Sequence, residues 1–238
     1  MSQSLVSARW DAEYRRGRYG GEPPLPFVDS ILATIRARSL TERRGLYIGC
    51  GNGRNYLPLV RSGLQLYGLD LSAEALRQLA AREPALSRRL ICADFRTFVS
   101  RRRFSYVIAV QVFQHGVAAD VAGYFSRVGS LLAPGGLFFL RVNAASTQVR
   151  RLHTVIERND LGGFTIRYES GPKQGLPVHF FARDELHALT RDDFALVAGP
   201  REDVTARTPP DTGHWVQWEA TWKRLNSQSE RRQRRNGP

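Results

Sequence analysis

Three glycines at alternate positions, Gly49, Gly51 and Gly53, form the part of the sequence best suited to chemistry. They follow a short apolar run, residues 45–48, and precede a segment that is compatible with a helix. Glycine adopts positive φ angles and lets a ligand approach the backbone without a Cβ in the way. The exposed N–H groups at a helix start favour a polar or anionic ligand group. The pattern therefore predicts a buried strand, a tight turn and a helix start that together hold a polar ligand.

An aspartate ends the next apolar run. Asp70 follows residues 64–69, which read as a second buried strand. A carboxylate at the end of the second strand of a nucleotide-binding fold is placed to accept hydrogen bonds from the hydroxyls of a ribose. Together with the glycine turn, Asp70 predicts the nucleoside-binding half of a doubly wound α/β fold.

The glycine spacing distinguishes between two classes of nucleoside cofactor. The dinucleotide fingerprint requires a glycine at its sixth position. This chain has Arg54 there, whose bulk would obstruct the close packing of helix on strand that the glycine permits. The pattern G-x-G-x-G instead resembles motif I of the class I S-adenosylmethionine-dependent methyltransferases. The resemblance implies that the cofactor is S-adenosyl-L-methionine.

Further features follow in the order that this family shows. Residues 90–93 read as a third strand and lead into Asp94 and Phe95, to which the resemblance assigns the adenine amine and the adenine ring. Residues 104–110 read as a fourth strand. The residues expected to bind the cofactor are Gly49, Cys50, Gly51, Asn52, Gly53, Asn55, Asp70, Leu71, Asp94, Phe95 and Gln111.

The remaining elements complete the sheet of the family. A helix over 120–133 leads through the turn 134–136, Pro-Gly-Gly, into a fifth strand over 137–140. Strands near 193–199 and 214–223 form a closing antiparallel hairpin, whose tryptophans we expect in the core. The resemblance therefore implies an α/β fold of the doubly wound type, with a mostly parallel seven-stranded sheet and helices on both faces.

The same pattern suggests how the chain is organised. Residues 26–225 form a single methyltransferase domain, and residues 1–25 form an N-terminal lid segment. Residues 143–180 form an insertion that caps the substrate, because an ordered connection this long is usually functional. Residues 226–238 form a basic tail without an apolar anchor, which we expect to be disordered.

Residues 111–116, Gln-Val-Phe-Gln-His-Gly, follow the fourth strand and bear on the acceptor. Enzymes that methylate exocyclic amines of nucleobases carry an Asn/Asp-Pro-Pro-aromatic turn there, whose aromatic ring stacks on a flipped base. This segment lacks that turn and resembles bacterial small-molecule methyltransferases, including the tellurite-resistance type. Gln111 and Gln114 could equally hold the substrate or the methionine end of the cofactor. The residues expected at the substrate are Tyr19, Gln114, Arg141 and Asn143.

His115 is the candidate catalytic residue. It follows a strand end at the edge of the sheet where open α/β folds bind ligands. A neutral imidazole there could take a proton from a hydroxyl or amine, with a titration near ~6.5, the reference pKa of histidine. A histidine that only hydrogen-bonds a loop carbonyl is an equal alternative.

One position departs from the family. Many members carry an acidic residue two positions before the first glycine, near the methionine amine, and this chain has Tyr47. The contact to the amine must then come from elsewhere, either from carbonyls of the loop or from the N-terminal segment.

Composition agrees with a cytoplasmic enzyme. The net charge is +13, but arginine supplies nearly all of it, since Lys173 and Lys223 are the lysines. This bias suits a GC-rich coding sequence as well as phosphate binding. No apolar run approaches the ~18 residues of a membrane helix, and the N-terminal residues contain no apolar signal core. Cys50 and Cys92 do not form a disulfide framework, and the histidines show no metal-ligand spacing.

The sequence therefore predicts methyl transfer from S-adenosyl-L-methionine to a small-molecule acceptor by direct displacement. One alternative is an RNA or protein methyltransferase that uses the basic surface. Another is a non-catalytic nucleoside-binding protein, or an oxidoreductase, on the same scaffold. The acceptor, the methylated atom and the oligomeric state stay open.

Overall fold

The structure is a computed structural model that divides into two compact units, Met1–Ile108 and Ala109–Pro238. This division cuts across the predicted domain 26–225, and the predicted organisation of the chain stays a prediction. The described residues are 3–17, 19–171, 173–210 and 212–226.

The first unit alternates helices and strands. Its elements are α1 (Gln3–Arg15), α2 (Phe27–Ala37), β1 (Arg44–Ile48), α3 (Tyr56–Arg61), β2 (Gln65–Asp70), α4 (Ala73–Arg82), the 3-10 helix η1 (Pro84–Arg89) and β3 (Leu90–Cys92). β1 pairs in parallel with β2, and β2 pairs in parallel with β3. Residues 45–48 of β1 are all buried, as expected of a parallel strand that is covered on both faces. The carboxyl ends of β1 and β2 carry the glycine turn and Asp70.

The second unit follows β4 (Phe104–Val110), along which the chain passes from one unit to the other. Its further elements are α5 (Ala118–Leu131), β5 (Leu132–Asn143), β6 (His153–Arg158), β7 (Phe164–Tyr168), β8 (Pro177–Phe180), α6 (Arg183–Thr190), β9 (Phe194–Ala206) and β10 (His214–Arg224). Aromatic rings fill its interior: the ring centroid of Phe138 lies 5.8 Å from that of Phe125 and 5.7 Å from that of Trp222.

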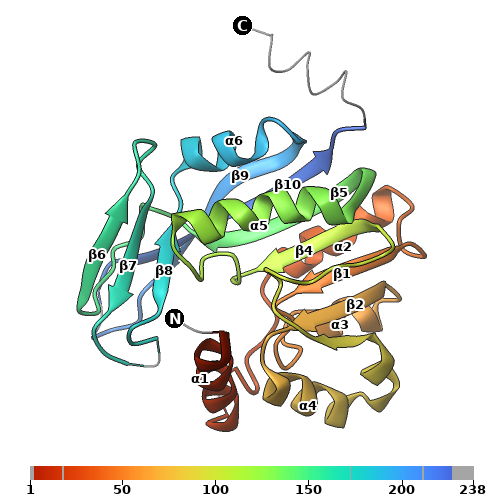
Figure 1. Ribbon diagram of the computed structural model, residues 1–238, viewed down its shortest axis with the longest axis horizontal. Coiled ribbons are helices and arrows are strands. Elements are labelled where there is room, and N and C mark those ends of the chain that lie inside the picture. Colours follow the sequence, from red (N-terminus) through yellow and green to blue (C-terminus); the bar gives the residue numbers. More distant parts are fainter. Residues whose placement is uncertain (1–2, 18, 172, 211, 227–238) are drawn as a thin grey trace, which may run out of the picture. The chain divides into compact units, whose positions relative to one another are not determined.

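The strands form the predicted sheet. Within the described residues, seven strands are ordered β3-β2-β1-β4-β5-β10-β9 (Figure 1). β10 runs antiparallel to both β5 and β9, while the strands of the first unit pair in parallel. The predicted fold class, a doubly wound α/β fold with a mostly parallel seven-stranded sheet, is confirmed. In the same described part of the chain, β6, β7 and β8 form a separate antiparallel sheet inside the predicted cap insertion.

The boundary between α5 and β5 differs from the prediction. The helix ends at Leu131 rather than at residue 133, and β5 begins at the next residue. Leu132 is already extended, with φ −74° and ψ 144°. Pro134 explains the early end, because proline disfavours the helical conformation in the residue before it. The Pro-Gly-Gly segment therefore belongs to the start of the strand.

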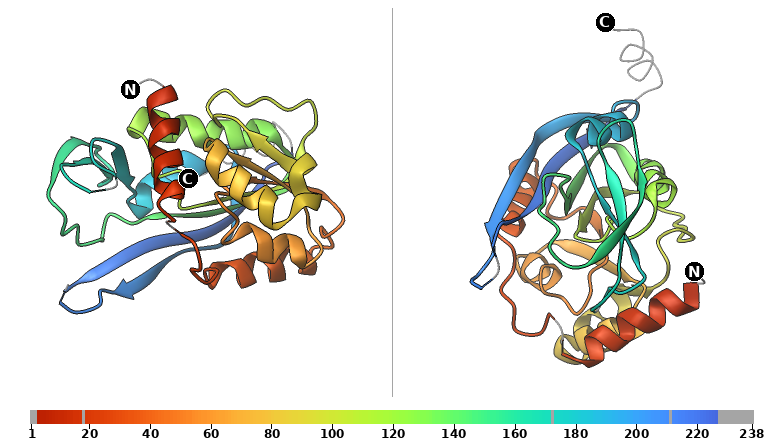
Figure 2. Two further views of the ribbon diagram at one scale, coloured as in Figure 1. Left: turned by 90° about the horizontal axis from the view of Figure 1, so that it is seen from below. Right: turned by 90° about the vertical axis from the view of Figure 1, so that its left-hand side faces the viewer.

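The closing hairpin is longer than predicted. Figure 2 shows β9 and β10 (blue) running side by side as a long ribbon. Of its tryptophans, Trp222 is buried, whereas Trp215 and Trp218 are half-buried, so the expectation that all three lie in the core is wrong for two of them. Trp215 and Trp218 lie in the half of β10 that is nearer the hairpin loop. Trp218 Nε1 donates to the carbonyl of Phe181 at 2.8 Å.

Two further predictions concern membrane-spanning segments and the C-terminal tail. None of the helices in the described segments combines the length and apolarity that crossing a bilayer demands. The predicted tail lies outside the described residues from 227 onward.

Candidate functional site

The glycine turn has the predicted backbone. Gly49, Gly51 and Gly53 have φ angles of +69°, +55° and +98°, a region that residues with a Cβ rarely adopt. The turn also lacks room for side chains. A Cβ on Gly51 would lie 2.5 Å from the hydroxyl of Tyr14, and a Cβ on Gly53 would lie 2.7 Å from Leu79 Cδ1. Glycine is therefore required at both positions.

Asp70 is bound to the turn. Its Oδ2 accepts from the N–H of Gly51 at 2.7 Å, and its Oδ1 accepts from the N–H of Ser72 at 2.8 Å. Burial raises the pKa of this carboxyl from 3.8 to about 6, although main-chain N–H groups of Ser72, Gly51 and Leu71 act in the opposite direction. An ionised carboxylate has about four lone-pair sites, so these donors leave it capacity to accept from a ligand hydroxyl. We define the cradle as residues 49–53 together with Asp70.

Helix α1 is fastened to the segment that follows Asp70. Asp11 Oδ1 accepts from the hydroxyl of Ser72 at 2.6 Å and from the N–H of Glu74 at 3.0 Å, so it caps the start of α4. Ser7 Oγ donates to the carbonyl of Leu71 at 3.1 Å. The spacing of four residues between Ser7 and Asp11 puts both on one helix face.

Tyr14 lies three residues further along that face, in the predicted lid segment, and was not among the residues predicted to bind the cofactor or the substrate. Its carbonyl accepts from Gln78 Nε2 at 3.0 Å, and its hydroxyl lies over Gly51. Burial and the charge of Asp70 raise the pKa of Tyr14, so the phenol stays protonated as a donor. The ring of Tyr19, a predicted substrate residue, lies 5.8 Å from the ring of Tyr14 between centroids. The spacing of residues 7, 11 and 14 is the sequence signal that places these three side chains on one face of the helix.

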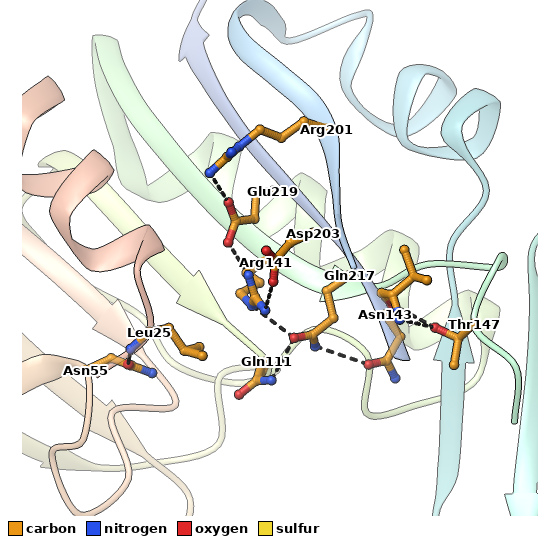
Figure 3. Close-up of polar contacts among 11 residues, drawn as sticks. Leu25, Asn55, Gln111, Arg141, Asn143, Thr147, Arg201, Asp203, Gln217 and Glu219 are labelled. Atoms are coloured by element: carbon orange, nitrogen blue, oxygen red, sulfur yellow. Dashed lines mark hydrogen bonds and ion pairs between the residues drawn. The ribbon is translucent and has the colours of Figure 1, made fainter. Parts of the chain in front are cut away.

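Other predicted cofactor residues also lie around the turn. Asn55 Oδ1 accepts from the N–H of Leu25 at 2.9 Å (Figure 3). Asn52 is buried, and Cys50 is a buried free thiol whose pKa is raised by burial. In the described part of the chain, no three His, Cys, Asp or Glu side chains gather as a metal site would require.

Asp94 has a strong partner of its own. Its carboxylate accepts from the main-chain N–H of Arg96 at 2.8 Å and from the guanidinium of the same residue at 2.6 and 2.9 Å. Both Asp94 and Phe95 are buried. The adenine contacts assigned to these two residues stay a prediction, in which the amine would have to share the carboxylate with Arg96.

In the second unit, polar side chains gather where β4 and β5 end and along β10 (Figure 3). Gln111 has a φ angle of +57°, its N–H donates to the carbonyl of Arg141 at 2.7 Å, and its Nε2 donates to Gln217 Oε1 at 2.8 Å. Gln217 faces Asn143 and Glu219 faces Arg141 across the β5–β10 pair. Alternate residues of a strand share a face, so the polar residues 217 and 219 in an apolar strand are the sequence signal for this polar face.

The structure gives Arg141 a different role from the predicted substrate contact. Its guanidinium is 96–97% removed from solvent and forms ion pairs with Glu219 and, at 2.6 Å, with Asp203. Its Nε donates to Gln217 Oε1 at 2.9 Å. These partners occupy all three nitrogens, so Arg141 is a structural residue of the strand pairing. Arg201 also pairs with Glu219, at 2.6 Å.

Gln114 and Asn143 were also predicted at the substrate. Gln114 is buried, and its Oε1 accepts from the N–H of Asn143 at 3.1 Å, which ties the loop after β4 to the end of β5. The predicted substrate contact of Gln114 stays a prediction. Asn143 Oδ1 accepts from Gln217 Nε2 at 3.3 Å. Its Nδ2 is buried, and the described residues supply no partner for it, so Asn143 stays a candidate.

His115 is half-buried in a loop that is bound to neighbouring elements. It forms a β-bridge with Val178, and its carbonyl accepts from the hydroxyl of Tyr124 at 2.9 Å. Burial and the positive charge of Lys173 lower the pKa of His115 well below 6.5, while a hydrogen bond to the backbone of Gln111 acts in the opposite direction. The expected titration near the reference value is therefore wrong, and the imidazole is neutral at pH 7.

Comparison with known proteins identifies the chain. A family model described as a methyltransferase domain matches residues 15–194. The ubiquinone biosynthesis O-methyltransferase of Bradyrhizobium sp. (strain ORS 278) is 36% identical over 100 residues, which are 41% of this chain and 39% of that protein. The enzyme of the same name from Nitrobacter winogradskyi is 37% identical over 116 residues, 47% of this chain and 42% of that protein. The chain thus spans less than half of the length of these relatives.

Solved structures support the fold. The 1,6-didemethyltoxoflavin-N1-methyltransferase of Burkholderia thailandensis has a TM-score of 0.62 at 19% identity, covering 94% of this chain and 91% of that one. The magnesium protoporphyrin IX methyltransferase of Synechocystis PCC 6803 has a TM-score of 0.64 at 15% identity, covering 93% and 99%. Both were solved with bound S-adenosylhomocysteine. Because the family model matches well over half of the sequence, the chain belongs to the family of methyltransferase domains, enzymes that use S-adenosyl-L-methionine, as the glycine turn predicted.

Proposed function

We propose that this chain transfers the methyl group of S-adenosyl-L-methionine to a small-molecule acceptor. The observation that carries the proposal is the cradle, in which the buried carboxylate of Asp70 accepts from the N–H of Gly51 at 2.7 Å within a turn of three glycines at positive φ. This arrangement joins a ribose acceptor to a backbone that leaves space for a ligand.

The residues of the cradle fit the nucleoside of the cofactor. Asp70 would accept from the ribose hydroxyls with the lone-pair capacity that its main-chain donors do not use. Tyr14 would offer its hydroxyl as a donor beside the turn. Asp94 and Phe95 would hold the adenine. When bound, the cofactor supplies a methyl group on a positively charged sulfonium, which is already an activated leaving group.

The small-molecule acceptor is supported by the relatives and by the loop after β4. The relatives are named for ubiquinone biosynthesis, for didemethyltoxoflavin and for magnesium protoporphyrin IX. The loop lacks the aromatic turn of enzymes that methylate exocyclic amines of nucleobases. We propose that Tyr19 and Asn143 contact the acceptor, and that Gln111 contacts either the acceptor or the methionine end of the cofactor.

His115 is proposed as the general base. Because its pKa is lowered well below 6.5, the ring is neutral at pH 7. The hydrogen bond to the backbone of Gln111 fixes the tautomer, so the second ring nitrogen carries the lone pair that can accept a proton. The protein otherwise contributes by aligning the nucleophile with the methyl group and excluding water.

Ligand binding and methyl transfer test the proposal. Saturation at ~100 times Kd stabilises a protein by about 2.7 kcal/mol, so S-adenosylmethionine and S-adenosylhomocysteine should raise the Tm while NADH should not. Radioactive methyl transfer to a panel of small hydroxyl and amine compounds, with total RNA and protein as competing acceptors, should label the small molecules. A shift with NADH alone contradicts the proposal. Label found only in RNA or protein supports the alternative.

A further inference from the structure

Arg141 determines how the side-chain amides of the polar cluster in the second unit are oriented. The cluster consists of Gln111, Arg141, Asn143, Asp203, Gln217 and Glu219. A guanidinium carries donors and no acceptor. Arg141 Nε lies 2.9 Å from a side-chain amide atom of Gln217, so that atom must be the oxygen. Glu219 and Asp203 hold the other two nitrogens of Arg141, so the guanidinium is fixed in place (Figure 3).

The orientation of the Gln217 amide determines that of the Asn143 amide. With its oxygen toward Arg141, Gln217 turns its nitrogen toward Asn143, which must therefore present its own oxygen at 3.3 Å. Asn143 Nδ2 is left buried without a partner among the described residues. Turning the Asn143 amide around would set two NH₂ groups face to face. The unpaired Nδ2 is thus a consequence of the direction that Arg141 imposes.

Gln111 is hydrogen-bonded to the same side-chain oxygen of Gln217 as Arg141. Its amide lies 2.8 Å from the Gln217 oxygen, so the atom of Gln111 that faces Gln217 is the nitrogen. The main chain is pinned as well, because the N–H of Gln111 donates to the carbonyl of Arg141 at 2.7 Å. The amide of Gln111 therefore turns its oxygen away from Gln217, and the side chain is half-buried rather than enclosed.

We propose that Gln217 is a positioning residue that holds the Gln111 amide with its oxygen outward, so that Gln111 recognises a hydrogen-bond donor on the ligand. The inference rests on the proposed function, which it deepens by specifying the chemistry of one contact. The donor is either the α-ammonium of the cofactor or an O–H or N–H group of the methyl acceptor. A carboxylate, phosphate or ether oxygen would meet another acceptor at this position.

The orientation can be measured without any ligand. In the wild type, the side-chain amide of Gln111 should give a resolved, slowly exchanging ¹⁵N–¹H resonance pair. Gln217→Met removes the acceptor and should move this pair to the position of a solvated amide. Gln217→Glu keeps an oxygen for both Arg141 and Gln111 and should retain the wild-type pair. A solvated, rapidly exchanging Gln111 amide in the wild type overturns the inference.

Binding and kinetics then identify the source of the donor. S-adenosylhomocysteine carries the ammonium, while 5′-deoxy-5′-methylthioadenosine lacks the whole amino-acid end. If Gln111 binds the cofactor, Gln217→Met should raise the Kd of S-adenosylhomocysteine about tenfold and leave that of methylthioadenosine unchanged. If Gln111 binds the acceptor, both Kd values should stay within twofold while the KM of a labelled acceptor rises about tenfold and kcat changes less.

A double-mutant cycle separates positioning from general damage. In a Gln111→Ala background, Gln217→Met should raise the Kd of S-adenosylhomocysteine or the KM of the acceptor by less than a further twofold. The reason is that Gln111, which Gln217 positions, is no longer present. Equal losses for S-adenosylhomocysteine and methylthioadenosine, additive losses in the cycle, or no change in any ligand arm would overturn the inference. A wild type that holds Gln111 rigidly but binds no S-adenosylhomocysteine and transfers no methyl group would instead contradict the proposed function.

Discussion

Ligand binding at the cradle should depend on pH through Asp70. The side chain is 8% exposed, and its pKa is raised from 3.8 to about 6, chiefly by burial. Because the folded-state pKa lies above the unfolded one, the folded protein holds this proton more tightly. Its contribution to stability is therefore most favourable below pH ~4 and falls as the pH rises through 6, by about 3 kcal/mol in all.

A ribose that donates two hydroxyls requires the ionised carboxylate. Each pH unit below 6 should therefore weaken the binding of S-adenosylhomocysteine about tenfold, so that Kd at pH 5 is about ten times Kd at pH 7. Asp70→Asn removes the titration. It also places an NH₂ group against the N–H of Gly51 or Ser72, and the buried unpaired donors should cost roughly 1–3 kcal/mol of stability.

Isothermal titration calorimetry with S-adenosylhomocysteine between pH 5 and 8 measures this dependence. Asp70→Asn should bind more weakly at pH 7 and show a flat profile. Asp29→Asn, which alters an exposed aspartate of α2, is the matched control and should keep the wild-type profile. A wild-type Kd that changes less than twofold between pH 5 and 7, or a sloping profile in Asp70→Asn, would refute the reasoning.

Three further outcomes are expected. Gly53→Ala should lower the free energy of unfolding by about 1–3 kcal/mol in a urea titration, because Gly53 has a φ of +98° and the added Cβ would lie 2.7 Å from Leu79 Cδ1. An unchanged midpoint would contradict the geometry of the turn. Arg141→Met should cost about 3–5 kcal/mol by removing the buried partner of Glu219, which then keeps only the exposed Arg201. Arg201→Met should cost less than about 1 kcal/mol, because this arginine is exposed; equal losses would show that burial does not decide the effect. His115→Ala should lower kcat about 10²-fold, and wild-type kcat should be flat from pH 7 to 8 because His115 is already neutral. Unchanged turnover would exclude the base.

The elements that sequence could predict are those specified by neighbouring residues. The glycine turn and Asp70 were predicted because their conformation and their place at a strand end follow from local spacing. The strand over residues 104–110 was also predicted with its bounds. By contrast, the predicted helix end at 133 was wrong, because the effect of Pro134 on the residue before it was not weighed.

The contacts that sequence could not predict join residues far apart in the chain. Arg141 was assigned to the substrate with the polar residues of the insertion after the fifth strand, yet its partners Asp203 and Glu219 come from strands 62 and 78 residues further on. Tyr14 was not assigned to the site, because its position over Gly51 depends on how α1 docks. Such contacts are decided by tertiary packing, on which local spacing carries little information.

The pairing of Arg141 with Glu219 also restricts how β10 can align with β5. A slip of one residue turns every side chain of a strand to the opposite face. A slip of two residues would bring Thr221 or Gln217 opposite Arg141 and would remove Glu219 from its place opposite the buried guanidinium. An apolar strand pair loses no ion pair on such a slip, whereas breaking a buried ion pair is strongly destabilising. The ion pair thus favours the native alignment of the two strands over slipped ones, which the neighbouring apolar residues do not do.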